Sequence, residues 1–299
     1  MHSLFVKPTE VAILADVDPL LEFIQRFPRL LVLTGAGCSL ASGIPTYRDR
    51  RGNWQSAVPI THQEFLLRPA SRRRYWVRSF SGWPVVAAAT PNCAHRALVD
   101  LEEAGYCRQL VTQNVDCLHQ KAGQQQVVDL HGRLDQVLCL DCKTVHPRDD
   151  VQQQLAKLNP QLREFNTPGP RAPDGDADVA DDQLGSINEP ACTKCGGMLK
   201  PNVVFFGDNV DRQLVDYVYS LLDNSDGLLV VGSSVMVFSG YRFCRYASQQ
   251  GKPVACINPG KTRADDLYRL KIKGDCSEIL GNVVASLQAA RPYSMGSRS

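Results

Sequence analysis

The chain has 299 residues, of which 43% are hydrophobic and 21% are charged. At roughly 150 residues per domain, this length predicts about two domains, or one large α/β domain with a satellite. The hydrophobic fraction excludes a largely disordered chain. The 33 basic and 31 acidic residues leave a net charge of +2, too small for a global attraction to nucleic acid or anionic lipid. We therefore expect neither as a partner.

The sequence leads us to expect neither a targeting segment nor a membrane span. The longest nearly unbroken apolar stretch, residues 227–238, is too short and too polar to span a bilayer. Acidic residues at Glu10, Asp16 and Asp18 precede the first arginine, Arg26, which is typical of neither a secretory signal nor a transit peptide. We expect a cytoplasmic protein.

Short runs rich in Val, Ile and Leu, each closed by turn residues, predict a series of buried strands. They cover residues 30–34, 108–115, 127–130, 203–206, 228–232 and 254–257. Helices are predicted between several of them, over residues 91–104, 211–224 and 240–250. Apolar strands that alternate with helices are typical of a parallel sheet covered on both faces. The main domain is therefore expected to be α/β and doubly wound.

Two glycines follow the first predicted strand, in the segment Gly35-Ala36-Gly37. Glycines at this place allow backbone N–H groups to approach a pyrophosphate, which the N-terminus of a following helix also favours. The third glycine of the G-x-G-x-x-G pattern is missing, because Leu40 stands in its place. A plain strand–turn–helix junction therefore remains an alternative interpretation.

Polar clusters lie at or shortly after the carboxyl ends of three of the predicted strands. They cover residues 42–49, 112–116 and 130–132. Because the carboxyl ends of parallel strands meet at one edge of a sheet, we expect these clusters to share one binding mouth. The alternatives are that His131 is a surface or capping residue and that Asn114 and Asp116 are turn formers.

Four of the 11 cysteines form two C-x2-C pairs, Cys139 with Cys142 and Cys192 with Cys195. Each pair presents two thiolates from one tight turn, and four thiolates complete a tetrahedral zinc shell without an open position. The pattern predicts one structural Zn2+, with four unrelated buried thiols as the alternative. An odd number of cysteines also fits a reducing compartment better than a disulfide framework.

Taken in order, these motifs resemble those of the sirtuins, the NAD-dependent protein deacylases. The motifs are Gly35-Ala36-Gly37, Gly43-Ile44-Pro45, Gln113-Asn114-Val115-Asp116, His131-Gly132, the two cysteine pairs, residues 200–208, Gly232-Ser233-Ser234 and Asn258-Pro259-Gly260. The resemblance covers about residues 20–290. Shorter segments at residues 74–76, 82–84, 172–176 and 239–242 resemble class II, the branch of mitochondrial sirtuin four and its bacterial relatives.

The resemblance implies a domain organisation. A discontinuous Rossmann-like domain that binds NAD would comprise residues 1–52, 91–133 and 201–299. Residues 53–90 would form a cofactor loop and a helical insertion, and residues 134–200 a small zinc-binding domain.

The resemblance also implies roles for individual residues. His131 would be the general base, and Asn114 and Asp116 would position the nicotinamide ribose and carboxamide. The residues implied to bind NAD are Gly35, Ala36, Gly37, Ser39, Gly43, Ile44, Pro45, Tyr47, Arg48, Gln113, Asn114, Asp116, Gly232, Ser233, Ser234, Asn258, Pro259, Gly260 and Cys276. Of these, Pro45, Tyr47 and Arg48 would belong to the cofactor loop, which continues into residues 53–90. The segment Val203, Val204, Phe205, Phe206 and Gly207 would pair with the backbone of an extended acyl-lysine peptide.

Two further positions bear on the substrate and on redox chemistry. Tyr75 and Arg78 stand one helical turn apart and resemble the pair with which class II desuccinylases hold an acyl carboxylate. The alternative is a solvated helix face that includes Arg78 and residues 72–74. Cys38 replaces the usual sirtuin Ile, and we interpret it as a packing residue, with a redox-sensitive thiol as the alternative.

The implied reaction is NAD-dependent deacylation of protein lysine, with acetyl, longer or acidic acyl groups, and release of nicotinamide and O-acyl-ADP-ribose. A mono-ADP-ribosyltransferase that uses the same NAD pocket is the alternative, and a feeble NAD-binding module is a third interpretation. We expect a monomer whose partners are acyl-lysine proteins or peptides. The resemblance adds the mitochondrial matrix as a second possible location.

Overall fold

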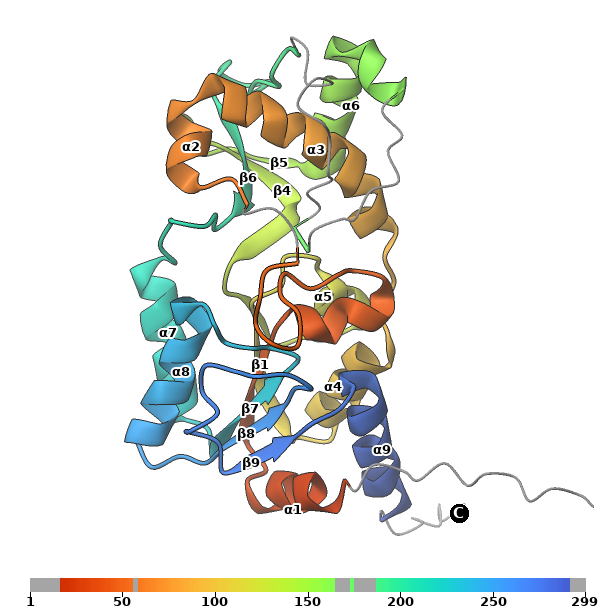
Figure 1. The fold of residues 1–299 in the computed structure, drawn as a ribbon, viewed down its shortest axis with the longest axis vertical. Helices are drawn as coiled ribbons and strands as arrows, with labels where there is room; N and C mark the ends of the chain where they lie inside the picture. The colour runs from red at the N-terminus through yellow and green to blue at the C-terminus, as the bar shows by residue number, and fades with distance from the viewer. Residues whose placement is uncertain (1–16, 56–58, 165–172, 175–186, 291–299) are drawn as a thin grey trace, which may run out of the picture.

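The computed structural model describes residues 17–55, 59–164, 173–174 and 187–290. In this part of the chain, two sheets follow one another along the long axis of the molecule (Figure 1). The larger sheet has six strands in the order β3-β2-β1-β7-β8-β9, and the smaller has three in the order β5-β4-β6. Paired strands are parallel in the larger sheet and antiparallel in the smaller one. The predicted parallel α/β class is confirmed.

The larger sheet is built from short, buried strands. Its members are β1 (Leu30–Thr34), β2 (Cys107–Thr112), β3 (Val127–Asp129), β7 (Gly227–Val231), β8 (Val254–Ile257) and β9 (Leu270–Ile272). Every residue of β1, β7 and β8 is buried, as expected for strands with both faces covered.

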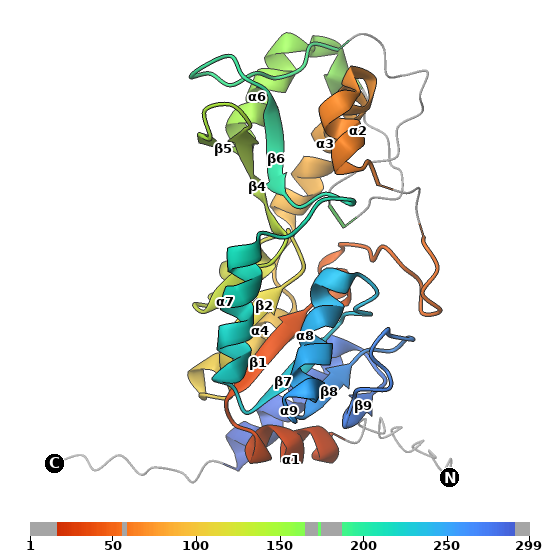
Figure 2. The ribbon, with the colours of Figure 1, turned by 90° about the vertical axis from the view of Figure 1, so that its left-hand side faces the viewer.

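Helices cover both faces of this sheet. One face packs against α1 (Asp18–Arg26), α4 (Cys93–Glu103) and α9 (Cys276–Ala289). The other packs against α7 (Arg212–Asp223) and α8 (Phe238–Gln249), which lie side by side in Figure 2. Successive residues of β1 alternate between the two cores, with Leu30 and Val32 in one and Leu31 and Leu33 in the other. The doubly wound prediction is confirmed.

The smaller sheet carries its own core. It consists of β4 (Gly132–Cys139), β5 (Val145–Pro147) and β6 (Leu199–Val203). The helices α2 (His62–Leu67), α3 (Pro69–Ala88) and α6 (Arg148–Leu158) pack on it through side chains such as Phe65, Trp76 and Leu155. The helices within residues 53–90 therefore pack on the small sheet and share its core (Figure 1). The domain boundaries remain a prediction.

Two predicted strands differ from the structure. The strand predicted over residues 108–115 ends at Thr112, because residues 113–116 leave the sheet to form polar contacts. The strand predicted over residues 203–206 is wrong: β6 ends at Val203 in the small antiparallel sheet, and Phe206 forms only an isolated bridge with Thr61. An apolar run indicates burial, and here packing of Phe205 against the rings of Tyr75 and Phe65 supplies it without a strand.

The remaining elements are short. They are η1 (Ala36–Ser42), α5 (Leu118–Ala122) and η2 (Pro160–Glu164). Among the described residues, no helix is long and apolar enough to cross a membrane. Most of the class II segment at residues 172–176 lies outside the described residues.

Two buried histidines lie where α4 and α5 meet the sheet. His95 Nδ1 accepts a hydrogen bond from the Asn92 backbone N–H at 3.3 Å. His119 Nε2 lies 2.9 Å from Thr34 Oγ1, whose own proton is donated to Thr112 Oγ1. Burial lowers the pKa of His95 to about 4 and the pKa of His119 well below 6.5. Both imidazoles are therefore neutral in the folded protein at pH 7.

These histidines predict acid sensitivity. Because the unfolded chain binds protons at a higher pH than the folded one, their contribution to stability is present above pH 6.5 and is lost as the pH falls toward 4. The expected loss is about 1.4 kcal/mol per pH unit for each histidine, or roughly 2 °C in Tm for a chain of this length. His119→Gln keeps an N–H donor for Thr34 and removes one titrating group. Its Tm should therefore fall less than that of the wild type when the pH is lowered from 7 to 5. Equal slopes in both proteins would contradict this account.

Candidate active site

The predicted site residues follow the carboxyl ends of neighbouring parallel strands. Gly35 follows β1, Gln113 follows β2, Gly232 follows β7 and Asn258 follows β8, while His131 stands two residues after β3. All of these ends lie at the edge of the large sheet that faces the small sheet (Figure 1). The structure thus brings the polar clusters to one edge, as the parallel topology predicts.

The glycine turn after β1 lies directly against the turn after β7. The N–H of Gly37 donates to the carbonyl of Gly232 at 2.8 Å, and the N–H of Gly35 donates to Val231 at 3.1 Å. A Cβ on Gly35 would lie 2.7 Å from Cβ of Ser233. Gly232 has φ +61° and packs against the backbone N of Cys38. These glycines therefore allow the backbones of the two turns to come into contact. This packing requires glycine whether or not a phosphate also binds at the turn.

Ser39, Asn114 and Asp116 form one buried chain of hydrogen bonds. The Ser39 hydroxyl donates to Asp116 Oδ2 at 2.6 Å and accepts from Asn114 Nδ2 at 3.1 Å. Asn114 Nδ2 also donates to the carbonyl of Gly35 at 3.1 Å, and the Leu118 N–H donates to Asp116 Oδ1 at 2.9 Å. Burial raises the pKa of the Asp116 carboxyl, and the Ser39 hydroxyl opposes that rise. The amide and the carboxylate are thus held in fixed orientations beside the glycine turn.

His131 has one defined tautomer in this arrangement. Its Nδ1 lies 2.9 Å from the backbone carbonyl of Gln113, and a carbonyl can only accept, so Nδ1 carries the proton. Nε2 therefore holds a lone pair, which accepts the Ser239 hydroxyl at 2.8 Å. Burial lowers the pKa of His131, the Gln113 carbonyl opposes this effect, and the charge of Arg242 adds to it. The imidazole is a neutral base with Nε2 available.

Gln113 connects three of the strand ends. Its backbone N–H donates to the Thr34 carbonyl at 3.0 Å, and its side-chain Nε2 donates to the same carbonyl at 3.1 Å and to Ser233 Oγ at 2.7 Å. Its own carbonyl holds His131. The sequence motif indicates a cofactor contact at this position, whereas the structure shows extensive internal bonding. Gln113 is therefore also a positioning residue.

The predicted cofactor loop contacts the predicted substrate segment through aromatic rings. The centroids of Tyr47 and Phe206 lie 5.6 Å apart, and those of Trp54 and Phe206 lie 5.4 Å apart. The Arg48 guanidinium lies 4.1 Å from the Trp54 ring centroid, and Arg48 Nη1 donates to Gly52. Trp54 is not among the residues predicted from the motifs, because its role depends on contacts distant in sequence. Gly43, Ile44 and Pro45 connect η1 to this loop.

The residues predicted for the adenosine side gather around the end of β8. Asn258 Nδ2 donates to the carbonyl of Gly260 at 3.2 Å, and Lys261 N–H donates to the carbonyl of Arg50 in the cofactor loop at 3.0 Å. Cys276 opens α9 and is 3% exposed. Pro259 and Ser234 lie in the same pair of loops, after β8 and β7. Cys38 is also buried, and burial raises its thiol pKa well above 9, which favours packing over redox sensitivity.

The predicted substrate segment begins beside His131. The Val204 N–H donates to the backbone carbonyl of His131 at 2.8 Å, and the His62 N–H donates to Phe206 at 2.9 Å. The Phe205 ring lies 5.4 Å from Tyr75. Arg78 is only 9% exposed. The alternative interpretation, that Arg78 lies on a solvated helix face, is therefore wrong for this residue.

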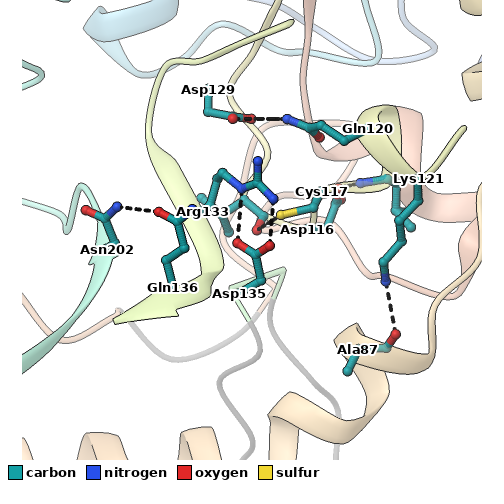
Figure 3. A network of polar contacts seen from close by, with 12 residues as sticks. Ala87, Asp116, Cys117, Gln120, Lys121, Asp129, Arg133, Asp135, Gln136 and Asn202 are labelled. Carbon is teal, nitrogen blue, oxygen red and sulfur yellow. Dashed lines mark hydrogen bonds and ion pairs between the residues drawn. The ribbon is translucent and has the colours of Figure 1, made fainter. Parts of the chain in front are cut away.

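A polar network extends from this site toward the small sheet (Figure 3). Arg133 forms an ion pair with Asp135 at 2.6 Å, close to Asp116 and Cys117. Lys121 Nζ of α5 donates to the carbonyl of Ala87 at the end of α3, at 3.0 Å. The network therefore connects the edge of the large sheet to the helical insertion.

The four paired cysteines gather at one end of the small sheet. Their sulfur atoms lie within 4.8 Å of one another, with Cys139 and Cys195 3.6 Å apart and Cys142 and Cys192 3.7 Å apart. A tetrahedral ion with Zn–S bonds of about 2.3 Å requires sulfur separations of about 3.8 Å. His146 Nε2 lies 3.2 Å from Cys192 Sγ, where an N–H can donate to a bound thiolate. The four sulfur atoms fit a structural zinc ion.

Comparison with known proteins agrees with this arrangement. Residues 35–239 match the model of the Sir2 family. The chain belongs to the Sir2 family. It is 48% identical over 270 residues to an NAD-dependent protein deacetylase of Xanthomonas campestris, covering 90% of this chain and 92% of that protein.

Two further similarities bear on substrates. The chain is 44% identical over 281 residues to the Bos taurus protein named NAD-dependent protein lipoamidase sirtuin-4, mitochondrial, covering 93% of this chain and 89% of that one. A solved Sir2 structure with a p53 peptide and NAD+ is similar to this chain, with a TM-score of 0.72 and 26% sequence identity. The match covers 92% of this chain and 100% of that chain. The resemblance to sirtuins, including the sirtuin-four branch and its bacterial relatives, is confirmed.

The zinc assignment predicts a specific loss of metal and stability. Cys192→Ser should lower bound zinc, measured by mass spectrometry of metals, from one ion per chain toward zero. It should also lower Tm by about 4 °C or more, since loss of a structural ligand removes binding energy that stabilises the fold. Cys93→Ser, at an exposed free cysteine outside the cluster, is the matched control. Full zinc retention in Cys192→Ser would contradict the assignment.

Proposed function

We propose that this Sir2 family member is an NAD-dependent protein-lysine deacylase that forms nicotinamide and O-acyl-ADP-ribose. The observation that carries the proposal is the neutral His131, whose Nε2 lone pair lies at the same sheet edge as the Ser39, Asn114 and Asp116 chain. The names of the bacterial and bovine relatives support it. The matching Sir2 structure with peptide and NAD+ supports both substrates.

The residues of the site suit a reaction without a protein nucleophile. NAD supplies an electrophilic ribose carbon when its bond to nicotinamide breaks, and the acyl oxygen of the substrate lysine attacks that carbon. We assign Asn114 and Asp116 to holding the nicotinamide ribose and carboxamide. His131 Nε2 accepts a proton from a ribose hydroxyl, a step for which Ser239 must give up its hydrogen bond.

The other predicted residues retain their proposed roles. The loops after β1, β7 and β8 would hold NAD, with Tyr47 and Arg48 on the cofactor loop. Residues 203–207 would pair with the peptide backbone, supported by their contact with the His131 carbonyl. We also propose a monomeric protein, which sedimentation velocity tests. A cytoplasmic location is proposed from the bacterial relatives, and cell fractionation tests it.

The role of His131 predicts a large and selective loss of activity. His131→Ala should lower the release of nicotinamide and deacylated peptide by about 10²-fold or more, since a general base contributes at least that factor. The assay combines NAD with acetyl-, succinyl-, glutaryl- and lipoyl-lysine peptides, followed by mass spectrometry. An unchanged Tm would show that the fold is intact.

Two outcomes would contradict the proposal. Normal turnover by a folded His131→Ala protein would exclude the histidine as the base. Wild-type protein that transfers label from NAD to protein without deacylating any peptide would favour the mono-ADP-ribosyltransferase alternative.

The acyl pocket gives a second prediction. Arg78, buried on α3 beside the aromatic cluster around Tyr75, is proposed to hold an acyl carboxylate. Arg78→Met should lower kcat/KM for succinyl- or glutaryl-lysine about tenfold more than for acetyl-lysine. Arg73→Met on the same helix, where the side chain is 39% exposed, is the control. Equal losses on all acyl groups would count against the assignment.

A further inference from the structure

Three arginines surround one exposed aromatic ring at the start of α8. The guanidinium carbons of Arg242, Arg245 and Arg263 lie 4.9, 5.5 and 5.8 Å from the centroid of Phe238. Arg263 also lies 4.5 Å from the ring of Tyr241. Phe238 is 42% exposed and the neighbouring Val237 is 44% exposed. We call Phe238, Tyr241 and the three arginines the arginine–aromatic patch.

The positive charge of this patch lacks a carboxylate partner within the described residues. None of the three arginines forms an ion pair there, and Arg263 Nη1 donates to the backbone carbonyl of Met236 at 3.2 Å. Asp265, two residues after Arg263, pairs with Lys271 at 2.6 Å instead. Nε of Arg242 is buried and has no hydrogen-bond partner. Contacts with the ring faces offset only part of the repulsion among three like charges.

The patch adjoins the candidate active site. Ser239, the residue after Phe238, places its hydroxyl 2.8 Å from His131 Nε2. Arg242 stands three residues after Ser239 on α8, so the two side chains share one face of the helix, and the charge of Arg242 contributes to lowering the pKa of His131. A polypeptide that presents its acyl-lysine to His131 therefore has its neighbouring residues within reach of these arginines, since an extended chain advances about 3.3 Å per residue.

We propose that the arginine–aromatic patch docks the flank of the substrate polypeptide and selects acyl-lysines that have Asp or Glu within about four residues. Carboxylates of the substrate would pair with the exposed guanidinium groups of Arg245 and Arg263, and apolar side chains between them would cover Phe238. This inference rests on the proposed deacylase function and names the substrate class for it. Unmodified nucleic acid or anionic lipid would satisfy the charges but would not place an acyl-lysine at His131.

The test compares peptides that differ only in charge. Three acetyl-lysine peptides would carry Glu, Gln or Lys at the four positions on either side of the acetyl-lysine, and kcat/KM would be measured with saturating NAD. We expect the Glu peptide to exceed the Gln peptide by about five- to tenfold, mostly through KM, and the advantage to shrink at high salt. If the protein deacylates no peptide, the proposed function itself fails; if it deacylates all three equally, only this inference fails.

Variants of one arginine make the test specific. Arg245 contacts the Phe238 ring and is not among the residues assigned to catalysis or NAD. Arg245→Gln should reduce the Glu preference about threefold, Arg245→Lys should retain most of it, and Arg245→Glu should favour the Lys peptide. Arg108→Gln, which removes the same charge near the opposite end of a central strand, is the control and should leave the preference unchanged.

Other anionic partners are distinguished by direct binding. Wild type and Arg245→Glu would be compared for binding to a 20-nucleotide single-stranded RNA and to vesicles of phosphatidylserine and phosphatidylcholine. If Arg245→Glu abolishes either interaction while the peptide preference stays unchanged, the patch serves that partner and the proposal is wrong. Loss of the peptide preference without such an effect supports it.

Discussion

Gln113 forms the hydrogen bonds on which the geometry of the candidate active site depends. Its side chain bridges the end of β1 at Thr34 to Ser233 after β7, and its backbone carbonyl fixes the proton of His131 on Nδ1. Without this carbonyl, the histidine could place its proton on either nitrogen. With it, Nε2 remains a hydrogen-bond acceptor, which a general base requires. One residue after β2 therefore sets both the spacing of the neighbouring turns and the chemistry of the base.

The two substrates of the proposed reaction share walls of the same site. Tyr47 and Trp54 of the cofactor loop pack on Phe206, while the preceding Val204 bonds to the His131 backbone. The residues proposed to hold NAD and those proposed to hold the peptide are thus in direct contact. When NAD orders the cofactor loop, less conformational entropy remains to be lost when the peptide orders the substrate segment, and the reverse also holds. Each substrate is therefore expected to increase the affinity for the other.

Much of this architecture follows from sequence pattern. The buried strand β1 has the predicted bounds, and the Cys139–Cys195 cluster forms from cysteines whose spacing already requires tight turns. Regular patterns of this kind depend on local geometry. The edge of the parallel sheet that gathers Gly35, Asn114 and His131 follows from strand direction alone.

Contacts between distant segments could not be predicted in the same way. The sequence places Ser239 in a class II motif, but its bond to His131 exists only because the first turn of α8 lies beside the turn that follows β3. The apolar run that ends at Phe206 predicts burial without indicating that β6 joins the small sheet. Similarly, Arg78 occurs among several arginines that favour exposure, and only packing on the small sheet shows that it is buried.

The most direct measurement is nuclear magnetic resonance of the imidazole nitrogens in protein labelled with 15N at its six histidines, with His131→Ala used to assign the signals. The account predicts that His131 is neutral, with its proton on Nδ1 and a pKa below 6.5. A proton on Nε2 would contradict it, because Nε2 could then not accept a proton from the ribose. A pKa above 6.5 would contradict the effect that burial has on this imidazole.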